Sequence, residues 1–62
     1  MTNETKKAIH ERAAEIAVWA EAILKETDPE KGYCSASYVS EKAELIGYYT
    51  NSIKRCLEED DK

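Results

Sequence analysis

Apolar residues recur in the first part of the chain with the spacing of an amphipathic helix. Their intervals are 4, 3, 4 and 3 residues, the heptad rhythm of a helix packed along one seam: Ile9, Ala13, Ile16, Ala20 and Ile23. Ala17 and Leu24 widen this stripe on one side, and Trp19 widens it on the other. With Thr2 or Asn3 as the N-cap, the pattern predicts a helix over about residues 3–26.

A second stretch repeats the rhythm after a short break. The break contains Asp28, Pro29 and Gly32, which predict a helix stop followed by a single turn, and Ser35 or Ser37 can cap the next helix. The heptad positions then follow at intervals of 4, 3, 4, 3 and 4: Val39, Ala43, Ile46, Thr50, Ile53 and Leu57, flanked by Tyr38, Leu45, Tyr49 and Cys56. This pattern predicts a second helix over about residues 36–58. Residues 58–62 form an acidic tail at the negative helix end and are expected to fray.

Two helices joined by a short elbow predict an all-α fold, an antiparallel two-helix hairpin that makes residues 1–62 a single domain. A chain of this length buries only about 60% of the surface of its unfolded form. The apolar arcs span about 160° on a helical wheel, so a hairpin leaves much of each arc uncovered. Alanine-rich faces allow helices to approach one another closely. Gly47 lies in mid-helix, where glycine costs about 1 kcal/mol relative to alanine, and this indicates that another helix or a ligand lies against the backbone there. We therefore expect a helical homo-oligomer.

Composition and charge exclude several functional classes. The chain has 13 acidic and 9 basic residues, a net charge of −4, and its lysines and arginines are scattered. This pattern disfavours binding to duplex nucleic acid, which normally needs a basic patch. The N-terminus shows no signal-peptide core, and no apolar run approaches the length of a membrane span. A cytoplasmic protein without membrane contact is expected.

The two cysteines are expected to be free thiols. Cys34 and Cys56 lie 22 residues apart, which is about 30 Å along a helix. A disulfide requires Cα atoms within about 7 Å. The spacing therefore argues against a bond between them.

No group of residues predicts an enzyme, a metal site or a cofactor. His10 is the single histidine and has no nucleophile at a helical spacing. Gly32 and Gly47 are isolated, so the chain has no glycine-rich phosphate loop. A non-enzymatic protein is the expectation.

The segment ELIGYYTNSIKR, residues 44–55, holds a candidate ligand site. By helical periodicity Tyr48 lies on the polar face beside Asn51 and Arg55. A tyrosine ring can stack on a base and a guanidinium can grip a phosphate, while Asn51 and Ser52 would add hydrogen bonds. In the alternative interpretation, Tyr48 contacts a neighbouring protomer and Arg55 pairs with the acidic tail.

The segments AIHERAAEIAVWAEAIL (8–24) and YYTNSIKR (48–55) resemble the two helices of small bacteriophage proteins that sequester cyclic oligonucleotides, the anti-CBASS and anti-Thoeris type sponges. In the first helix the similar residues are Ala8, Ile9, Ala13, Glu15, Ile16 and Ala17. Ala14 stands where the family has a lysine, and Arg12 is the nearest substitute. The family's N-terminal arm with its ligand-stacking tyrosine is missing, and Tyr33 in the longer elbow is a candidate replacement.

The resemblance implies a phage-type anti-defence protein that holds a cyclic nucleotide second messenger at a protomer interface in the host cytoplasm without cleaving it. On this hypothesis the ligand-binding residues comprise base-stacking aromatics, an amide and phosphate-binding cations: Trp19, Tyr33, Tyr48, Asn51, Arg12, Lys42 and Arg55.

Two other functions remain open from the sequence. The chain can be a small acidic helical protein that binds and inhibits a host protein through an apolar face containing Val18, Trp19 and Tyr38. It can also be a structural bundle without a ligand. A discrete oligomer stabilised by a nucleotide favours the first hypothesis, whereas a poorly helical monomer that orders with a protein favours the second.

Overall fold

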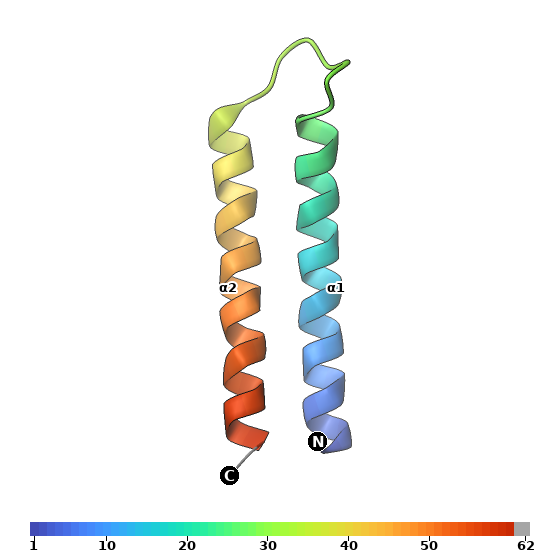
Figure 1. Ribbon diagram of the computed structural model, residues 1–62, viewed down its shortest axis with the longest axis vertical. Helices are drawn as coiled ribbons and strands as arrows, with labels where there is room; N and C mark the ends of the chain where they lie inside the picture. The colour runs from blue at the N-terminus through green and yellow to red at the C-terminus, as the bar shows by residue number, and fades with distance from the viewer. Residues whose placement is uncertain (61–62) are drawn as a thin grey trace.

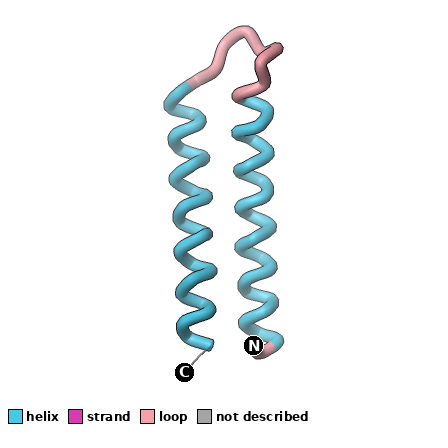
Figure 2. The backbone as a smooth tube through the Cα atoms, in the orientation of Figure 1, coloured by secondary structure: helices cyan, strands magenta, loops and turns pink. Residues whose placement is uncertain are grey.

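The computed structural model describes residues 1–60 and consists of two antiparallel helices (Figures 1 and 2). Helix α1 spans Asn3–Glu26 and helix α2 spans Ala36–Asp60. The predicted all-α hairpin is confirmed, with the bounds of α1 as expected. Helix α2 continues through residues 58–60, where a frayed end was expected, and residues 61–62 of that predicted tail lie outside the described part of the chain.

Polar side chains define where each helix begins. The Thr2 hydroxyl accepts a hydrogen bond from the Thr5 amide at 3.1 Å, which satisfies a free amide in the first turn of α1. The Ser35 hydroxyl accepts from the Tyr38 amide at 3.2 Å and does the same for α2. Of the candidate caps in the sequence, the structure therefore uses Thr2 and Ser35.

The connection between the helices contains the predicted single turn. The Lys31 amide donates to the Asp28 carbonyl at 2.9 Å, and the Glu30 amide donates to the Asp28 carboxylate at 3.0 Å. An aspartate that accepts from the backbone two residues ahead is a common way to fix such a turn. Helix α1 ends just before it, at Glu26, and its C-cap is Thr27, whose amide and hydroxyl both donate to the Ile23 carbonyl.

The helices meet along a seam that is rotated relative to the predicted one. Ile9, Ile16, Ala20 and Ile23 of α1 are half-buried as expected, but Ala13, Ala43, Thr50 and Leu57 are exposed, so this part of the prediction is wrong. Two heptad rows form the observed seam: Thr5, Ile9, Arg12, Ile16, Trp19, Ile23 and Glu26 on α1, with Val39, Lys42, Ile46, Tyr49, Ile53, Cys56 and Asp60 on α2.

Long basic side chains explain the rotation. Arg12 and Lys42 are both half-buried in the seam. Such side chains place their aliphatic stems against apolar neighbours and keep the charged group near the surface. The two positions therefore serve packing, although their charge marks them as surface residues in the sequence.

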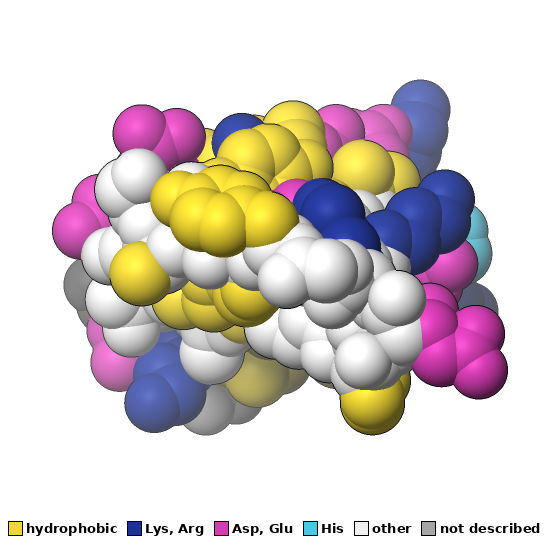
Figure 3. All heavy atoms as spheres, turned by 90° about the horizontal axis from the view of Figure 1, so that it is seen from above, with side chains coloured by type: hydrophobic (Ala, Val, Ile, Leu, Met, Phe, Trp, Pro, Cys, Tyr) yellow, Lys and Arg dark blue, Asp and Glu magenta, His cyan; other side chains and the backbone are white. Residues whose placement is uncertain are grey.

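The hairpin is a single layer of helix without an enclosed core. No side chain among residues 1–60 is buried, and the Cα atoms extend over 49 × 16 × 11 Å. The radius of gyration is 14.6 Å, whereas a compact domain of this length would have about 10–11 Å. Seen along the long axis, apolar side chains reach the surface between charged ones (Figure 3). Neither described helix has the length and apolarity needed to cross a membrane.

Candidate functional site

A shallow groove on the outer side of α2 brings together three of the predicted ligand-binding residues. We call it the Tyr48 groove; its lining residues are Tyr48, Asn51, Lys54, Arg55 and Glu58. All five come from consecutive turns of one helix. Tyr48 is 60% exposed, and its ring meets the Tyr49 ring edge to face, with centroids 5.2 Å apart and planes at 79°. Because Tyr49 is half-buried in the seam, it supports the exposed ring from below.

The Tyr48 groove is locally cationic on an acidic protein. Lys54 and Arg55 contribute two positive charges and Glu58 one negative charge, whereas the whole chain carries −4. Lys54 was missed as a site residue in the sequence. Its position three residues beyond Asn51, at helical spacing, was the available signal.

Ser52 turns away from this groove. Its hydroxyl accepts a hydrogen bond of 2.6 Å from Arg12 Nε across the seam. The predicted contribution of Ser52 to a ligand site is therefore replaced by a structural contact in the hairpin.

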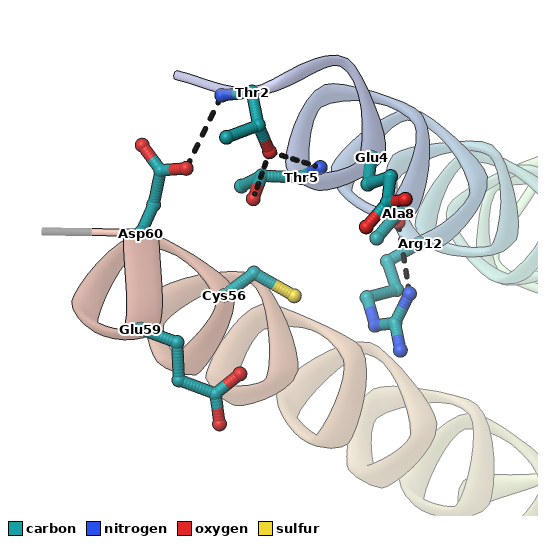
Figure 4. A pocket seen from close by; sticks show the side chains of 8 residues that line it. All are labelled: Thr2, Glu4, Thr5, Ala8, Arg12, Cys56, Glu59 and Asp60. Atoms are coloured by element: carbon teal, nitrogen blue, oxygen red, sulfur yellow. Dashed lines mark hydrogen bonds between the residues drawn. The ribbon is translucent and has the colours of Figure 1, made fainter. Parts of the chain in front are cut away.

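Arg12 lies at a pocket near the open end of the hairpin, apart from the Tyr48 groove. Besides its bond to Ser52, it donates from Nη1 to the Ala8 carbonyl at 3.0 Å. The pocket measures about 410 Å³ and is lined by residues from both helices: Thr2, Glu4, Thr5, Ala8, Arg12, Cys56, Glu59 and Asp60 (Figure 4). Three carboxylates around one guanidinium disfavour an anionic ligand there, because like charges repel a phosphate.

Trp19 and Lys42 form a separate cluster with Tyr38. Lys42 Nζ lies 5.1 Å from the centroid of the Trp19 ring and 4.7 Å from that of the Tyr38 ring. These distances are typical of cation–π contacts. The Nε1–H group of Trp19 is enclosed and has no hydrogen-bond partner among the described residues. In the hairpin, Lys42 therefore occupies the aromatic surface that Trp19 was predicted to offer to a base.

Tyr33 lies on the loop, away from the other candidates. It is 74% exposed. Both cysteines are free thiols, as predicted, with Cys34 exposed beside Tyr33 and Cys56 half-buried in the seam.

Two carboxylates fasten the ends of the hairpin. At the loop end Glu26 accepts hydrogen bonds from Lys31 Nζ and, at 2.7 Å, from the Ser35 amide, and these bonds lower the pKa of Glu26 and raise the pKa of Lys31. At the open end Asp60 accepts from the Thr2 amide at 3.2 Å and lies 3.6 Å from the Met1 amino group. The Thr2 bond is the main reason why the pKa of Asp60 is lowered. Hydrogen bonds to the charged form favour ionisation in both cases.

An apolar groove on the outer side of α1 contains Val18, one of the residues of the protein-binding hypothesis. Val18 is 56% exposed. The groove is lined by Val18, Glu21, Ala22, Lys25, Glu26, Lys31 and Tyr38. Trp19, the third residue of that hypothesis, belongs instead to the seam.

The comparisons with known proteins add no family. No protein-family model, curated protein or solved structure matches the chain. The sponge resemblance is therefore carried by the quoted sequence segments alone. Within residues 1–60, no group of three or more His, Cys, Asp or Glu side chains is placed to hold a metal ion.

Proposed function

We propose that the protein is a non-enzymatic, phage-type anti-defence protein that sequesters a cyclic nucleotide second messenger in the host cytoplasm. The observation that carries the proposal is the Tyr48 groove, in which an exposed ring, an amide and two cations lie within three helical turns. The other predicted residues, Arg12, Trp19, Lys42 and Tyr33, lie elsewhere in the hairpin, so the proposal rests on Tyr48, Asn51 and Arg55, with Lys54 added.

Each side chain in the groove matches one part of a nucleotide. The Tyr48 ring would stack on a base, an interaction worth about 1–3 kcal/mol. Arg55 would bind a phosphate through two parallel N–H bonds, and Lys54 would add a second charge near it. Asn51 would donate and accept at a base edge.

A groove built from one helix covers only one side of a ligand. A cyclic nucleotide with two-fold symmetry presents the same groups on both sides. Two Tyr48 grooves from different protomers would therefore enclose it. For this reason the proposal places the ligand at an interface between protomers.

Calorimetric titration with a panel of cyclic di- and trinucleotides tests this function. The substitutions Tyr48→Ala and Arg55→Ala are expected to weaken the binding of a recognised nucleotide at least tenfold. Tyr33→Ala and Lys25→Ala are the matched controls, because they remove an exposed tyrosine and an exposed cation outside the groove. Failure of the unaltered protein to bind any nucleotide of the panel, or equal losses in the controls, would contradict the proposal.

A second candidate function is inhibition of a host protein through the groove that contains Val18 and Tyr38. The observation in its favour is the exposed apolar surface of these two residues, flanked by Lys25 and Lys31. On this hypothesis Val18→Glu abolishes binding to the host protein, whereas Ala14→Glu, at an exposed position on the same helix, leaves it intact. Nucleotide binding that survives Val18→Glu separates the two candidates.

A further inference from the structure

The hairpin exposes more surface than a folded protein of its mass. A monomer of 7.0 kDa exposes about 4,000 Å² by the scaling of surface with mass, whereas this chain exposes 4870 Å². The excess of about 800 Å² equals what one partner contributes to a standard interface. The broad side of the hairpin, 49 by 16 Å between Cα atoms, has a similar area.

One broad side of the hairpin carries exposed alanine and leucine side chains that nothing covers. Ala8 and Arg12 share a pocket with Cys56 and Glu59 on one side of the seam. These residues lie on one broad side of the hairpin, so helical periodicity places the opposite flanks of the two helices together on the other broad side. We call that side the alanine–leucine face. Its exposed small and apolar residues are Ala13, Ala17, Leu24, Ala43, Gly47, Thr50 and Leu57, and the same periodicity places the exposed basic residues Lys6, His10 and Lys54 on it.

The alanine–leucine face has the chemistry of a helix interface. Within α1 and α2, helical periodicity places every aspartate and glutamate outside this face, on the seam, the opposite side or the outer edges, and the charged side chains on the face are those of Lys6 and Lys54. Leu24 is 67% exposed and Leu57 is 42% exposed. Fully burying a leucine side chain contributes roughly 1.5–3 kcal/mol, so this face loses that stabilisation while it stays in water.

Gly47 lies on this face, and nothing in the hairpin requires a glycine there. A Cβ atom at Gly47 would meet no heavy atom within 4 Å. A mid-helix glycine costs about 1 kcal/mol relative to alanine. Absence of a side chain at an open position is useful when a second backbone approaches closely.

The arrangement of large and small residues on the face is self-complementary. The small residues Ala13, Ala17 and Gly47 lie near its centre, between Leu24 towards the loop end of α1 and Leu57 towards the open end of α2. With a rise of 1.5 Å per residue, each leucine lies about 14 Å from that centre. A two-fold axis that lies in the plane of the interface, through the centre and perpendicular to the line joining the two leucines, would bring Leu24 of one copy opposite Leu57 of the other.

We infer that the alanine–leucine face binds a second copy of this chain and forms a two-fold symmetric four-helix bundle. Each copy would bury about 800 Å², the share of a standard interface. The closed two-fold contact uses the same surface on both copies. The Tyr48 groove lies on the outer side of α2 and shares only Lys54 with this face, so the dimer leaves Tyr48, Asn51 and Arg55 open. The inference therefore does not depend on the proposed ligand.

Sedimentation equilibrium on the full chain and two variants tests the interface. The unaltered protein is expected to sediment as a dimer, and Ala13→Glu, which puts a carboxylate at the centre of the interface, is expected to weaken dimerisation at least 100-fold. Ala14→Glu is the matched control, because it makes the same change one residue along on the outer side of the helix. A monomeric unaltered protein, or a dimer lost with Ala14→Glu and kept with Ala13→Glu, overturns the inference.

Cross-linking tests the two-fold geometry and does not depend on whether Ala13→Glu folds. In chains carrying Cys34→Ser and Cys56→Ala, Leu24→Cys and Leu57→Cys are made separately and mixed under mild oxidation. Disulfide-linked pairs are expected from the mixture, with few from either variant alone. Equal cross-linking within each variant, or none in the mixture, overturns the inference. Nucleotide titration of the Ala13→Glu variant reports on the Tyr48 groove separately, so failure of one proposal is distinguishable from failure of the other.

Discussion

Arg12 on α1 and Ser52 on α2 are joined by a hydrogen bond of 2.6 Å between Nε and Oγ. This bond crosses the seam in the interior of the hairpin, whereas the contacts of Thr2 with Asp60 and of Ser35 with Glu26 close its two ends. Both groups are half-buried, so loss of the acceptor leaves a charged donor without a partner in a partly dry site.

Ser52→Ala is therefore expected to lower the free energy of unfolding by about 1–2 kcal/mol. Ser40→Ala is the control, because it makes the same change at an exposed position of α2 and carries the same gain in helix propensity. Urea denaturation followed by circular dichroism measures both. Equal stability of the two variants would show that the Arg12–Ser52 bond contributes nothing.

The hairpin is expected to lose stability in acid because Glu26 and Asp60 both have lowered pKa values. In the unfolded chain these carboxyl groups bind protons at a higher pH than in the folded chain. Stability is therefore fully present at neutral pH, begins to fall below about pH 5, and is lost as the pH falls through the lowered pKa values.

The thermal midpoint, measured from pH 7 to pH 3, checks this dependence. Glu26→Gln should reduce stability at pH 7 and flatten the decline in acid, because its contribution to proton uptake is gone. Glu21→Gln, an exposed position on the same helix, should follow the unaltered protein. The same slope in all three proteins would remove Glu26 from the explanation.

Lys42→Met is expected to change the surroundings of the single tryptophan. The ammonium group lies over the rings of Trp19 and Tyr38, and its removal costs about 0.5–1 kcal/mol while the unbranched stem is kept. The emission spectrum of Trp19 should shift together with the loss of stability. Lys25→Met, on the outer side of α1, should change neither quantity. An unchanged Trp19 spectrum in Lys42→Met would mean that the stack does not persist in solution.

Gly47→Ala is expected to stabilise the isolated hairpin by about 1 kcal/mol, because a Cβ atom there meets open space. The measurement is made in the Ala13→Glu background, where the second copy is absent and only the hairpin is compared. Denaturant unfolding of that pair of variants gives the difference. A destabilised Gly47→Ala would show that the hairpin itself requires the glycine.

Local features of the hairpin could be predicted from the sequence because they depend on nearby residues. The bounds of α1, the caps at Thr2 and Ser35, and the turn at Asp28 all follow from contacts within four residues along the chain. The rotation of each helix about its own axis, which decides which residues face the other helix, could not be predicted. Each apolar arc is wide enough for two adjacent seams, and the choice depends on Arg12 and Lys42, whose long stems pack like apolar side chains.

The part of the candidate site that lies on one helix could be predicted from the sequence, whereas the part that depends on the packing of the two helices could not. Tyr48, Asn51 and Arg55 share a groove because they lie on one helix, and helical spacing is visible in the sequence. Arg12, Trp19, Lys42 and Tyr33 were grouped with them by chemistry alone. Their separation follows from the rotated seam, which turns the first three towards the opposite helix and leaves Tyr33 on the loop.

The contact of Asp60 with the first two residues has a topological consequence. Because Asp60 Oδ2 lies 3.6 Å from the Met1 amino group, the path of the backbone almost returns to its start. A short peptide bridge between the two ends would convert the chain into a closed ring with little change to either helix. Closure removes conformations from the unfolded ensemble and leaves the native geometry intact, so a cyclised chain should stay folded at temperatures that unfold the linear one.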